Sequence, residues 1–168
     1  MKKLVIIHGT MGVGKTTVCQ ELYKHLENAV WLDGDWCWLM HPLVVSEENK
    51  KMVLDNIKYV LRNYLKNSSF EYVIFNWVIH QEEIFDAILE GLQDFQFELY
   101  KITLLCSEDA LVKRMLAGGR DKDCIERSVQ RLDLYKTMDT IKIDTTYLGI
   151  LDIVAKIRRL IQQESQWR

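Results

Sequence analysis

The chain has 168 residues, of which 48% are hydrophobic and 27% are charged, and this length and composition suit one domain, residues 1–168, around a single core. Its formal net charge of −2 argues against a broad nucleic-acid-binding surface, and no apolar run reaches the roughly 18 residues that a membrane helix needs. The cysteines form no C-x-x-C pair, which favours reduced thiols in a cytoplasmic protein over zinc or disulfide roles.

Strand-like and helix-like segments alternate along the chain, which predicts an α/β fold with a parallel sheet. Strands are expected at 4–8, 29–32, 70–76, 98–106 and 140–144. Helices are expected at 15–27, at 81–90 with Ile84, Ile88 and Leu89 as its apolar residues, and at 121–135. Ser46 is expected to cap a helix that buries Val53, Ile57, Val60 and Tyr64, and Ser107 to cap a helix that carries Leu111, Met115 and Leu116. The last helix, after residue 144, is expected to bury Leu151, Val154, Ile157 and Ile161.

The segment between the first strand and the first helix is glycine-rich and ends in Lys-Thr. It reads Gly9-Thr10-Met11-Gly12-Val13-Gly14-Lys15-Thr16 and matches the Walker A pattern G-x-x-x-x-G-K-[ST] in full. Glycines allow the backbone N–H groups to surround an anion, to which the helix N-terminus adds its dipole. We expect Lys15 to reach the β- and γ-phosphates of a nucleotide and the Thr16 hydroxyl to bind Mg²⁺. A chance glycine-rich turn is the alternative, and the strand and helix in register argue against it.

Two carboxylates, Asp33 and Asp35, follow the second strand in Leu32-Asp33-Gly34-Asp35. Ligands of open parallel sheets bind beyond the carboxyl ends of the strands, so both carboxylates are expected near the bound triphosphate. One would hold Mg²⁺, and the other would orient or deprotonate an acceptor hydroxyl. A polar Asp-Gly turn is the alternative. Strand alternation would point the two to opposite faces, whereas a turn at Gly34 would bring both inward, and the sequence leaves this open.

These motifs resemble those of P-loop small-molecule kinases related to nucleoside monophosphate kinases, a group that includes shikimate, gluconate and adenylylsulfate kinases and chloramphenicol phosphotransferase. The resemblance rests on the P-loop, on LDGD, on an arginine-bearing region and on Ile143-Asp144-Thr145. It implies a three-layer P-loop NTPase fold with a five-stranded parallel sheet and helices on both faces. It also implies that Asp33 lies nearer the metal and Asp35 nearer the substrate.

Four arginines, Arg114, Arg120, Arg127 and Arg131, follow one another closely, and Gly118-Gly119 before Arg120 suggests a hinge into a short lid at about 117–127. Arginines stabilise the charge of a transferred phosphoryl group, although a solvated face paired with nearby acidic residues would show the same pattern. The resemblance places Arg114 beside adenine, Arg120 in the lid, Arg127 or Arg131 at the phosphates, and Thr145 under the adenine ring.

The sequence therefore predicts three sets of site residues. The catalytic set is Lys15, Asp35, Arg120 and Arg127, and the metal set is Thr16 and Asp33. The nucleotide-binding set is Gly9, Thr10, Met11, Gly12, Val13, Gly14, Lys15, Thr16, Thr17, Arg114 and Thr145. ATP is favoured over GTP, because no Asn-Lys-x-Asp segment is found.

Two further features bear on the acceptor and on the metal. Trp36, Trp38 and Trp77 fall near one sheet edge and either form a pocket for a flat or apolar molecule or simply pack helices on the sheet. Asn76 ends the third strand, where many P-loop proteins have a magnesium-linked Asp, so Asp33 must take more of the metal role or turnover is poor.

The function expected from these residues is ATP- and Mg²⁺-dependent phosphoryl transfer to a small-molecule hydroxyl. A nucleotide kinase is a first alternative, which would need basic residues that 33–49 lack, and a non-catalytic ATP-binding regulatory protein is a second. The expected partners are a small-molecule acceptor, with no nucleic acid and no membrane, for a monomer or homodimer in the cytoplasm.

Overall fold

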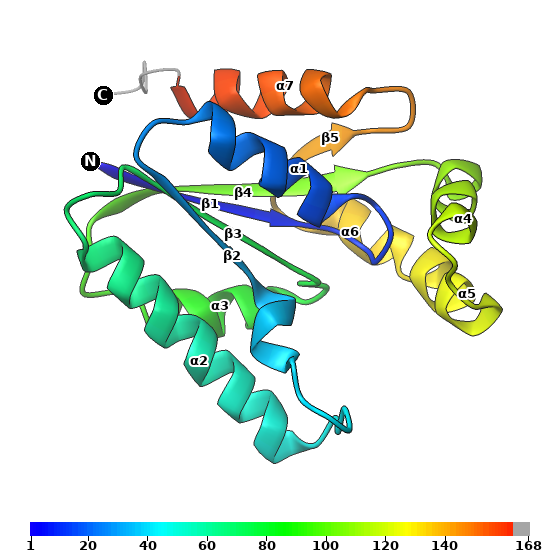
Figure 1. Ribbon diagram of the computed structural model, residues 1–168, viewed down its shortest axis with the longest axis horizontal. Coiled ribbons are helices and arrows are strands. Elements are labelled where there is room, and N and C mark those ends of the chain that lie inside the picture. The colour runs from blue at the N-terminus through cyan, green and yellow to red at the C-terminus, as the bar shows by residue number, and fades with distance from the viewer. Residues whose placement is uncertain (163–168) are drawn as a thin grey trace.

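A computed structural model describes residues 1–162 and has a five-stranded sheet at its centre. The strands are β1 (Lys2–His8), β2 (Ala29–Asp33), β3 (Tyr72–Trp77), β4 (Phe97–Leu105) and β5 (Ile141–Asp144). All pairs are parallel, in the order β2-β3-β1-β4-β5. Every strand therefore ends at the same edge, on the right of Figure 1.

Helices cover both faces of the sheet, as expected for the P-loop NTPase fold. α1 (Lys15–Leu22) and α7 (Ile150–Gln162) lie on one face, and α2 (Glu47–Lys66) and α3 (Glu82–Glu90) lie on the other (Figure 1). Successive side chains of β1 point to opposite faces of the sheet. Val5 and Ile7 belong to the core between the sheet and α1 and α7, whereas Leu4 and Ile6 belong to the core between the sheet and α2 and α3.

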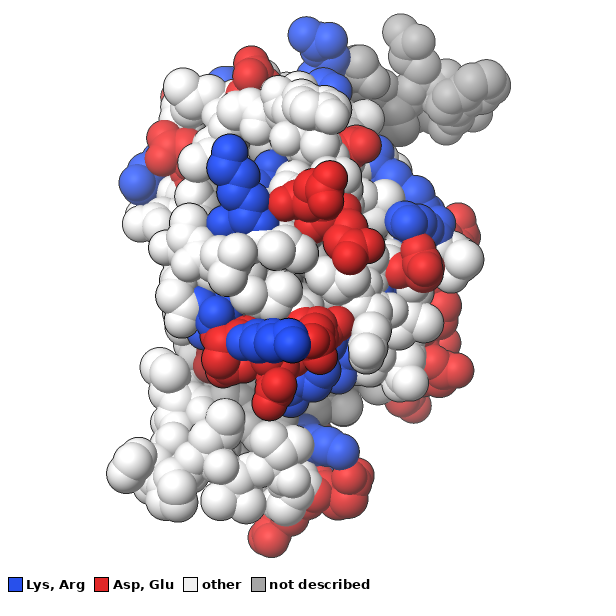
Figure 2. Space-filling model, turned by 90° about the vertical axis from the view of Figure 1, so that its right-hand side faces the viewer, with Lys and Arg blue, Asp and Glu red and all other residues white. Residues whose placement is uncertain are grey.

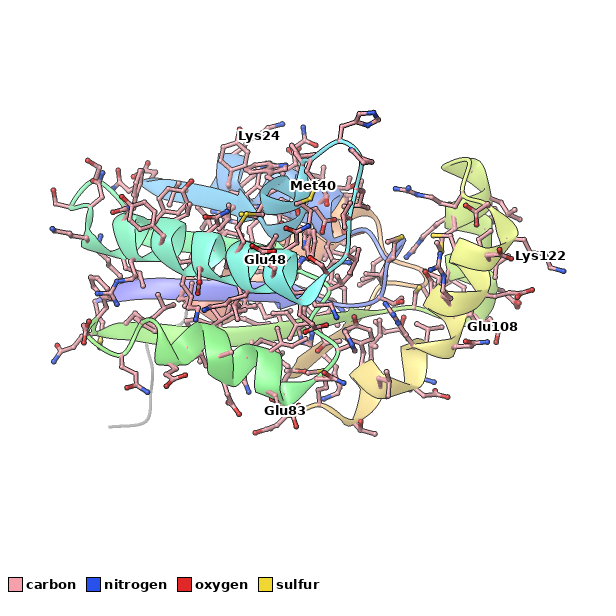
Figure 3. The ribbon with its side chains drawn as sticks, turned by 90° about the horizontal axis from the view of Figure 1, so that it is seen from below. Lys24, Met40, Glu48, Glu83, Glu108 and Lys122 are labelled. Carbon is pink, nitrogen blue, oxygen red and sulfur yellow. The ribbon has the colours of Figure 1, made fainter. Side chains whose placement is uncertain are left out.

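Three helices follow β4 and lie at the end of the sheet where the strands terminate (Figure 1). They are α4 (Glu108–Ala117), α5 (Lys122–Gln130) and α6 (Leu132–Thr137). In the view from below, α4 and α5 project beyond the strand ends, and Lys122 at the start of α5 points away from the molecule (Figure 3). Short 3₁₀ turns at Tyr23–His25 and Gly34–Trp38, η1 and η2, complete the described elements.

The two predicted serine caps are confirmed, because Ser46 accepts from the Asn49 N–H and Ser107 from the Ala110 N–H. Some buried faces were predicted wrongly. Leu151 is exposed, because α7 buries Ile153 beside Val154 instead. Of the three apolar residues expected in the helix after Ser107, α4 buries Leu111 and Met115 and exposes Leu116. In α2 the face is Val53, Ile57, Leu61 and Leu65, with Val60 and Tyr64 only partly buried.

The predicted helix 121–135 is two helices that meet at Arg131. The change of direction lets Ile125 pack in the core under α1 and α7, while Tyr135 packs in the core over α2 and α3. The predicted helix 15–27 likewise ends early, at Leu22, and continues as η1. No helix within residues 1–162 is long and apolar enough to cross a membrane.

Candidate functional site

The glycine-rich loop joins β1 to α1 at the strand-end edge of the sheet. Gly9, Gly12 and Gly14 have φ of +149°, +84° and +105°, a region that favours glycine. A Cβ on Gly12 would lie only 2.4 Å from Cγ of Met115, so this glycine also permits close packing on α4. Within the described residues no side chain caps α1 at Gly14, which leaves the N–H groups of its first turn available to an anion.

Lys15 folds back over this loop. Its Nζ donates to the carbonyl oxygens of Gly9 and Thr10, each at 3.0 Å, and the side chain is almost fully buried. Burial lowers the pKa of Lys15 from 10.5 to about 8, although nearby Asp35 and Asp33 favour the charged form. The loop thus holds a desolvated ammonium group where a phosphate would supply the missing counter-charge.

We expect this lowered pKa of Lys15 to make nucleotide binding pH-dependent. A bound phosphate stabilises the charged amine and raises its pKa, so we expect nucleotide binding at pH 8.5 to take up protons that Lys15 has lost in the empty protein. Calorimetry in two buffers of different ionisation enthalpy measures this uptake. In Lys15→Arg, whose guanidinium stays protonated, the uptake should disappear. A proton number that is the same in both proteins would contradict the expectation.

Asp33 and Asp35 have different surroundings. Asp33 is buried, and its two carboxylate oxygens accept from the Thr16 hydroxyl at 2.8 Å and from the Asp35 N–H at 3.0 Å. Asp35 follows two residues later in η2, and it is exposed at the open edge of the site. Crowding of its carboxyl by protein raises the pKa of Asp35, and Asp33 adds to the rise, whereas Lys15, Trp77 and Arg120 oppose it. Asp33 therefore faces Thr16, and Asp35 faces outward near Lys15.

The Thr16 hydroxyl and the Asp33 carboxylate fit the ligand preference of Mg²⁺. This ion takes hard oxygen ligands, and in nucleotide sites it uses one or two protein groups together with waters and phosphate oxygens. Asn76 lies beside Asp33 in the register of β2 and β3 and is buried, but its Oδ1 accepts from the Trp31 indole N–H at 2.6 Å. The oxygen of Asn76 is thus already engaged.

Arg114 and Thr145 meet although they come from α4 and from the segment after β5. The Arg114 guanidinium donates to the Thr145 hydroxyl at 3.0 Å and to the Thr145 carbonyl at 2.7 Å. Together with Val13 and Thr17 they line a cavity of about 530 Å³ beside the glycine-rich loop. The structure thus brings together four residues that the sequence and the resemblance placed at the nucleotide.

Arg127 and Arg131 line a second, smaller cavity of about 120 Å³, which they share with Thr10, Met11 and Tyr135. The Thr10 hydroxyl donates to the Ser128 carbonyl at 2.7 Å, which ties the glycine-rich loop to α5. Arg120 lies outside this cavity, exposed in the turn between α4 and α5. Charged side chains of both signs intersperse over the end of the molecule where the strands terminate (Figure 2).

The three tryptophans do not form one pocket. Trp36 packs on Trp31 with ring centroids 4.9 Å apart, and Trp31 stacks on Tyr23, all on the α1 side of the sheet. Trp38 and Trp77 instead pack against the core over α2 and α3. Trp36 is 47% exposed and contacts Trp31, so of the three tryptophans Trp38 and Trp77 are the two that lie on the same side of the sheet.

Sequence reasoning missed two buried residues of this region. His8 bonds the Ile79 carbonyl through Nδ1 at 2.9 Å and the Thr103 hydroxyl through Nε2 at 2.6 Å, and burial lowers its pKa to about 4. The His8 imidazole is therefore neutral, and its two hydrogen bonds connect the end of β1 to β4 and to the segment after β3. Tyr135 faces the smaller cavity, and its spacing of four residues from Arg131 was the available signal.

Residues 5–134 match a protein family described as an AAA domain. The chain belongs to this family. Comparison with curated proteins gives no match. Among solved structures, this AAA-domain chain has the fold of the tunicamycin resistance protein of Deinococcus radiodurans, with 17% identity, a TM-score of 0.69 and 98% of each chain covered.

Two kinases have the same fold. The shikimate kinase of Acinetobacter baumannii is 18% identical, with a TM-score of 0.64, 99% of this chain and 96% of that chain being covered. The gluconokinase of Sinorhizobium meliloti is 15% identical, with a TM-score of 0.65, 97% of this chain and 98% of that chain being covered. The chain thus has the P-loop kinase fold that the sequence predicted.

Proposed function

We propose that this protein is an ATP- and Mg²⁺-dependent kinase that transfers the γ-phosphoryl group to a hydroxyl of a small molecule. The observation that carries the proposal is the position of Asp35 near the buried Lys15, with Asp33 held apart on Thr16. A phosphate-binding lysine, a metal-ligand pair and a separate carboxylate are the groups that phosphoryl transfer to a hydroxyl requires. The shared fold with two kinases supports it.

In the proposed reaction the acceptor oxygen attacks the γ-phosphorus, the bond to the β–γ bridging oxygen breaks, and ADP leaves. The acceptor proton passes to Asp35, whose raised pKa suits a group that accepts a proton. Lys15 and the loop N–H groups bind the phosphates, and Arg120 with Arg127 or Arg131 would balance charge on the transferred group. Thr16 and Asp33 would hold Mg²⁺, which supplies neutralisation of the phosphate charge.

Asp35 and Asp33 should respond differently to removal of charge. We expect Asp35→Asn to lower kcat at least about tenfold while ATP-Mg²⁺ binding stays near wild type, because Asp35 would act on the acceptor. Phosphoryl transfer is largely dissociative, so a base matters less here than elsewhere. Asp33→Asn should instead weaken the magnesium dependence of binding. Titrations of both variants with Mg²⁺ and ATP test this division, and identical behaviour would refute it.

The proposed function is tested by measuring ATP consumption against a library of sugars, nucleosides and hydroxyl-bearing antibiotics, with the phosphorylated product detected by mass spectrometry. Turnover that needs one alcohol, ATP and Mg²⁺ supports a small-molecule kinase. Turnover only with nucleoside monophosphates would identify a nucleotide kinase instead, with Arg127 and Arg131 as the basic residues that the segment 33–49 lacks.

A second candidate is an ATP-binding regulatory protein without kinase activity. The observation in its favour is Asn76, which carries no charge and whose oxygen is occupied by Trp31. Tight nucleotide binding with no acceptor-dependent turnover across the whole library would favour this candidate.

A further inference from the structure

Trp77 carries a buried donor that meets no acceptor at normal hydrogen-bond geometry within the described chain. Within residues 1–162 its indole N–H is shielded from solvent and has no hydrogen-bond partner. Buried N–H groups are nearly always paired, because desolvation without a partner costs free energy. An unpaired donor at the strand-end edge of a sheet, where ligands bind in open α/β folds, therefore indicates a ligand atom that completes it.

The surrounding residues direct this donor toward the Asp33–Asp35 segment. Asp33 pairs with Asn76 in the sheet register, so Trp77 lies beside Gly34. A Cβ on Gly34 would lie 2.5 Å from Cγ and 2.6 Å from Cδ1 of Trp77. Because Cδ1 is bonded to Nε1, the N–H edge of the ring lies against the turn that leads into Asp35, and a residue larger than glycine would displace it.

Trp77 and Asp35 are complementary in hydrogen-bonding capacity. The indole N–H can only donate, and an ionised carboxylate can only accept. The Trp77 N–H lies near enough to the Asp35 carboxyl to lower its pKa, yet it falls outside normal hydrogen-bond geometry. An atom that both donates and accepts would satisfy the two groups at once.

We propose that the Trp77 indole N–H and the Asp35 carboxylate together form the recognition site for the acceptor hydroxyl, with Trp77 donating to its oxygen and Asp35 accepting its proton. The inference rests on the proposed kinase function and names what the acceptor presents there. A hydroxyl of an uncharged group satisfies both partners, because it has one donor and two lone pairs. A phosphate at the same place would be repelled by Asp35, and an ammonium group has no lone pair for Trp77.

The segment that follows η2, residues 39–46, has no Asp, Glu, Lys or Arg. No Lys or Arg lies between Lys24 and Lys50. The segment between η2 and α2 exposes Leu39, Leu43, Val44 and Val45, and Figure 2 shows an area without charged side chains toward the bottom of this end of the molecule. Met40, in the same segment, is labelled in Figure 3 near the start of α2. An acceptor whose body is neutral and partly apolar suits this surface.

The kinetic test uses Trp77→Phe, which keeps a ring against Gly34 and removes the N–H. We expect the KM for the best alcohol of the library to rise about three- to tenfold, the effect of one lost hydrogen bond, with the KM for ATP unchanged. Trp31→Phe is the matched control, because its N–H bonds Asn76 on the other side of the sheet. It should lower thermal stability without changing acceptor KM. Equal effects of Trp77→Phe on both KM values would show a merely structural role.

A second measurement observes the N–H itself. The ¹⁵N–¹H signal of the Trp77 indole, assigned by its loss in Trp77→Phe, is followed while glycerol, uridine and benzyl alcohol are added with Mg²⁺ and a non-hydrolysable ATP analogue. We expect the alcohol that is phosphorylated to shift this signal downfield, and glycerol 3-phosphate and uridine monophosphate to leave it in place. Phosphorylation of an alcohol without any such shift would overturn the inference and leave the kinase function intact. Absence of all turnover would instead reject the kinase, and if the alcohols also leave the signal unchanged, the recognition site is rejected with it.

Discussion

Lys15→Ala is expected to abolish ATP turnover and to weaken nucleotide binding severely while the domain stays folded. In the proposed function Lys15 would supply the point charge on the phosphates, and loss of one such electrostatic contact costs about 10²–10³-fold in turnover. The side chain is buried, and within residues 1–162 its ammonium group donates only to two carbonyl oxygens of its own loop. Its removal therefore takes away a desolvated ammonium group, together with the attraction that this group exerts on the nearby Asp33 and Asp35 carboxylates.

Calorimetric nucleotide affinity and thermal melting, measured side by side, separate lost binding from lost fold. Lys15→Arg is a useful companion, because it keeps the charge but not the compact ammonium group. Unchanged affinity and turnover in Lys15→Ala would refute the assignment of the glycine-rich loop as the phosphate site.

Arg120→Ala is expected to slow turnover by about 10²–10³-fold and to change ATP affinity much less. Arg120 follows Gly119, whose φ is +69°, and its N–H donates to the Met115 carbonyl at 3.0 Å, so the end of α4 fixes where the side chain begins. It is exposed, yet its charge reaches the Asp35 carboxyl and favours the ionised form. A guanidinium there can approach the transferred phosphoryl group while contributing little to the nucleotide-free state.

Steady-state kinetics with the acceptor found in the library, together with ATP titrations, test this expectation. Arg159→Ala is the matched control, because this exposed arginine lies in the last turn of α7. The end of α7 adjoins the start of β1, at the opposite end of the sheet from the site. If Arg120→Ala barely changes turnover, Arg120 is an ordinary surface residue and the proposed lid at 117–127 is wrong.

The sequence by itself predicted the phosphate loop and the alternation of strands and helices, because both depend on consecutive residues. The residues that define the phosphate loop, Gly9 to Thr16, are consecutive in the sequence. A buried strand followed by a helix can likewise be recognised from local hydrophobic patterns. The pairing of Arg114 with Thr145 came from the resemblance, and the structure brings the two within hydrogen-bond distance. The roles of these residues remain proposals.

The tertiary structure decided what no local pattern contains. Whether Gly34 turns the chain was open in the sequence, and it depends on the Trp77 ring, which packs on Gly34 from a neighbouring strand. The break at Arg131 likewise depends on burying Ile125 and Tyr135 in cores on opposite sides of the sheet. Long-range packing thus separates Asp33, bonded to Thr16, from Asp35 at the open edge. Among the residues that the structure describes, it also leaves the Trp77 N–H without a hydrogen-bond partner.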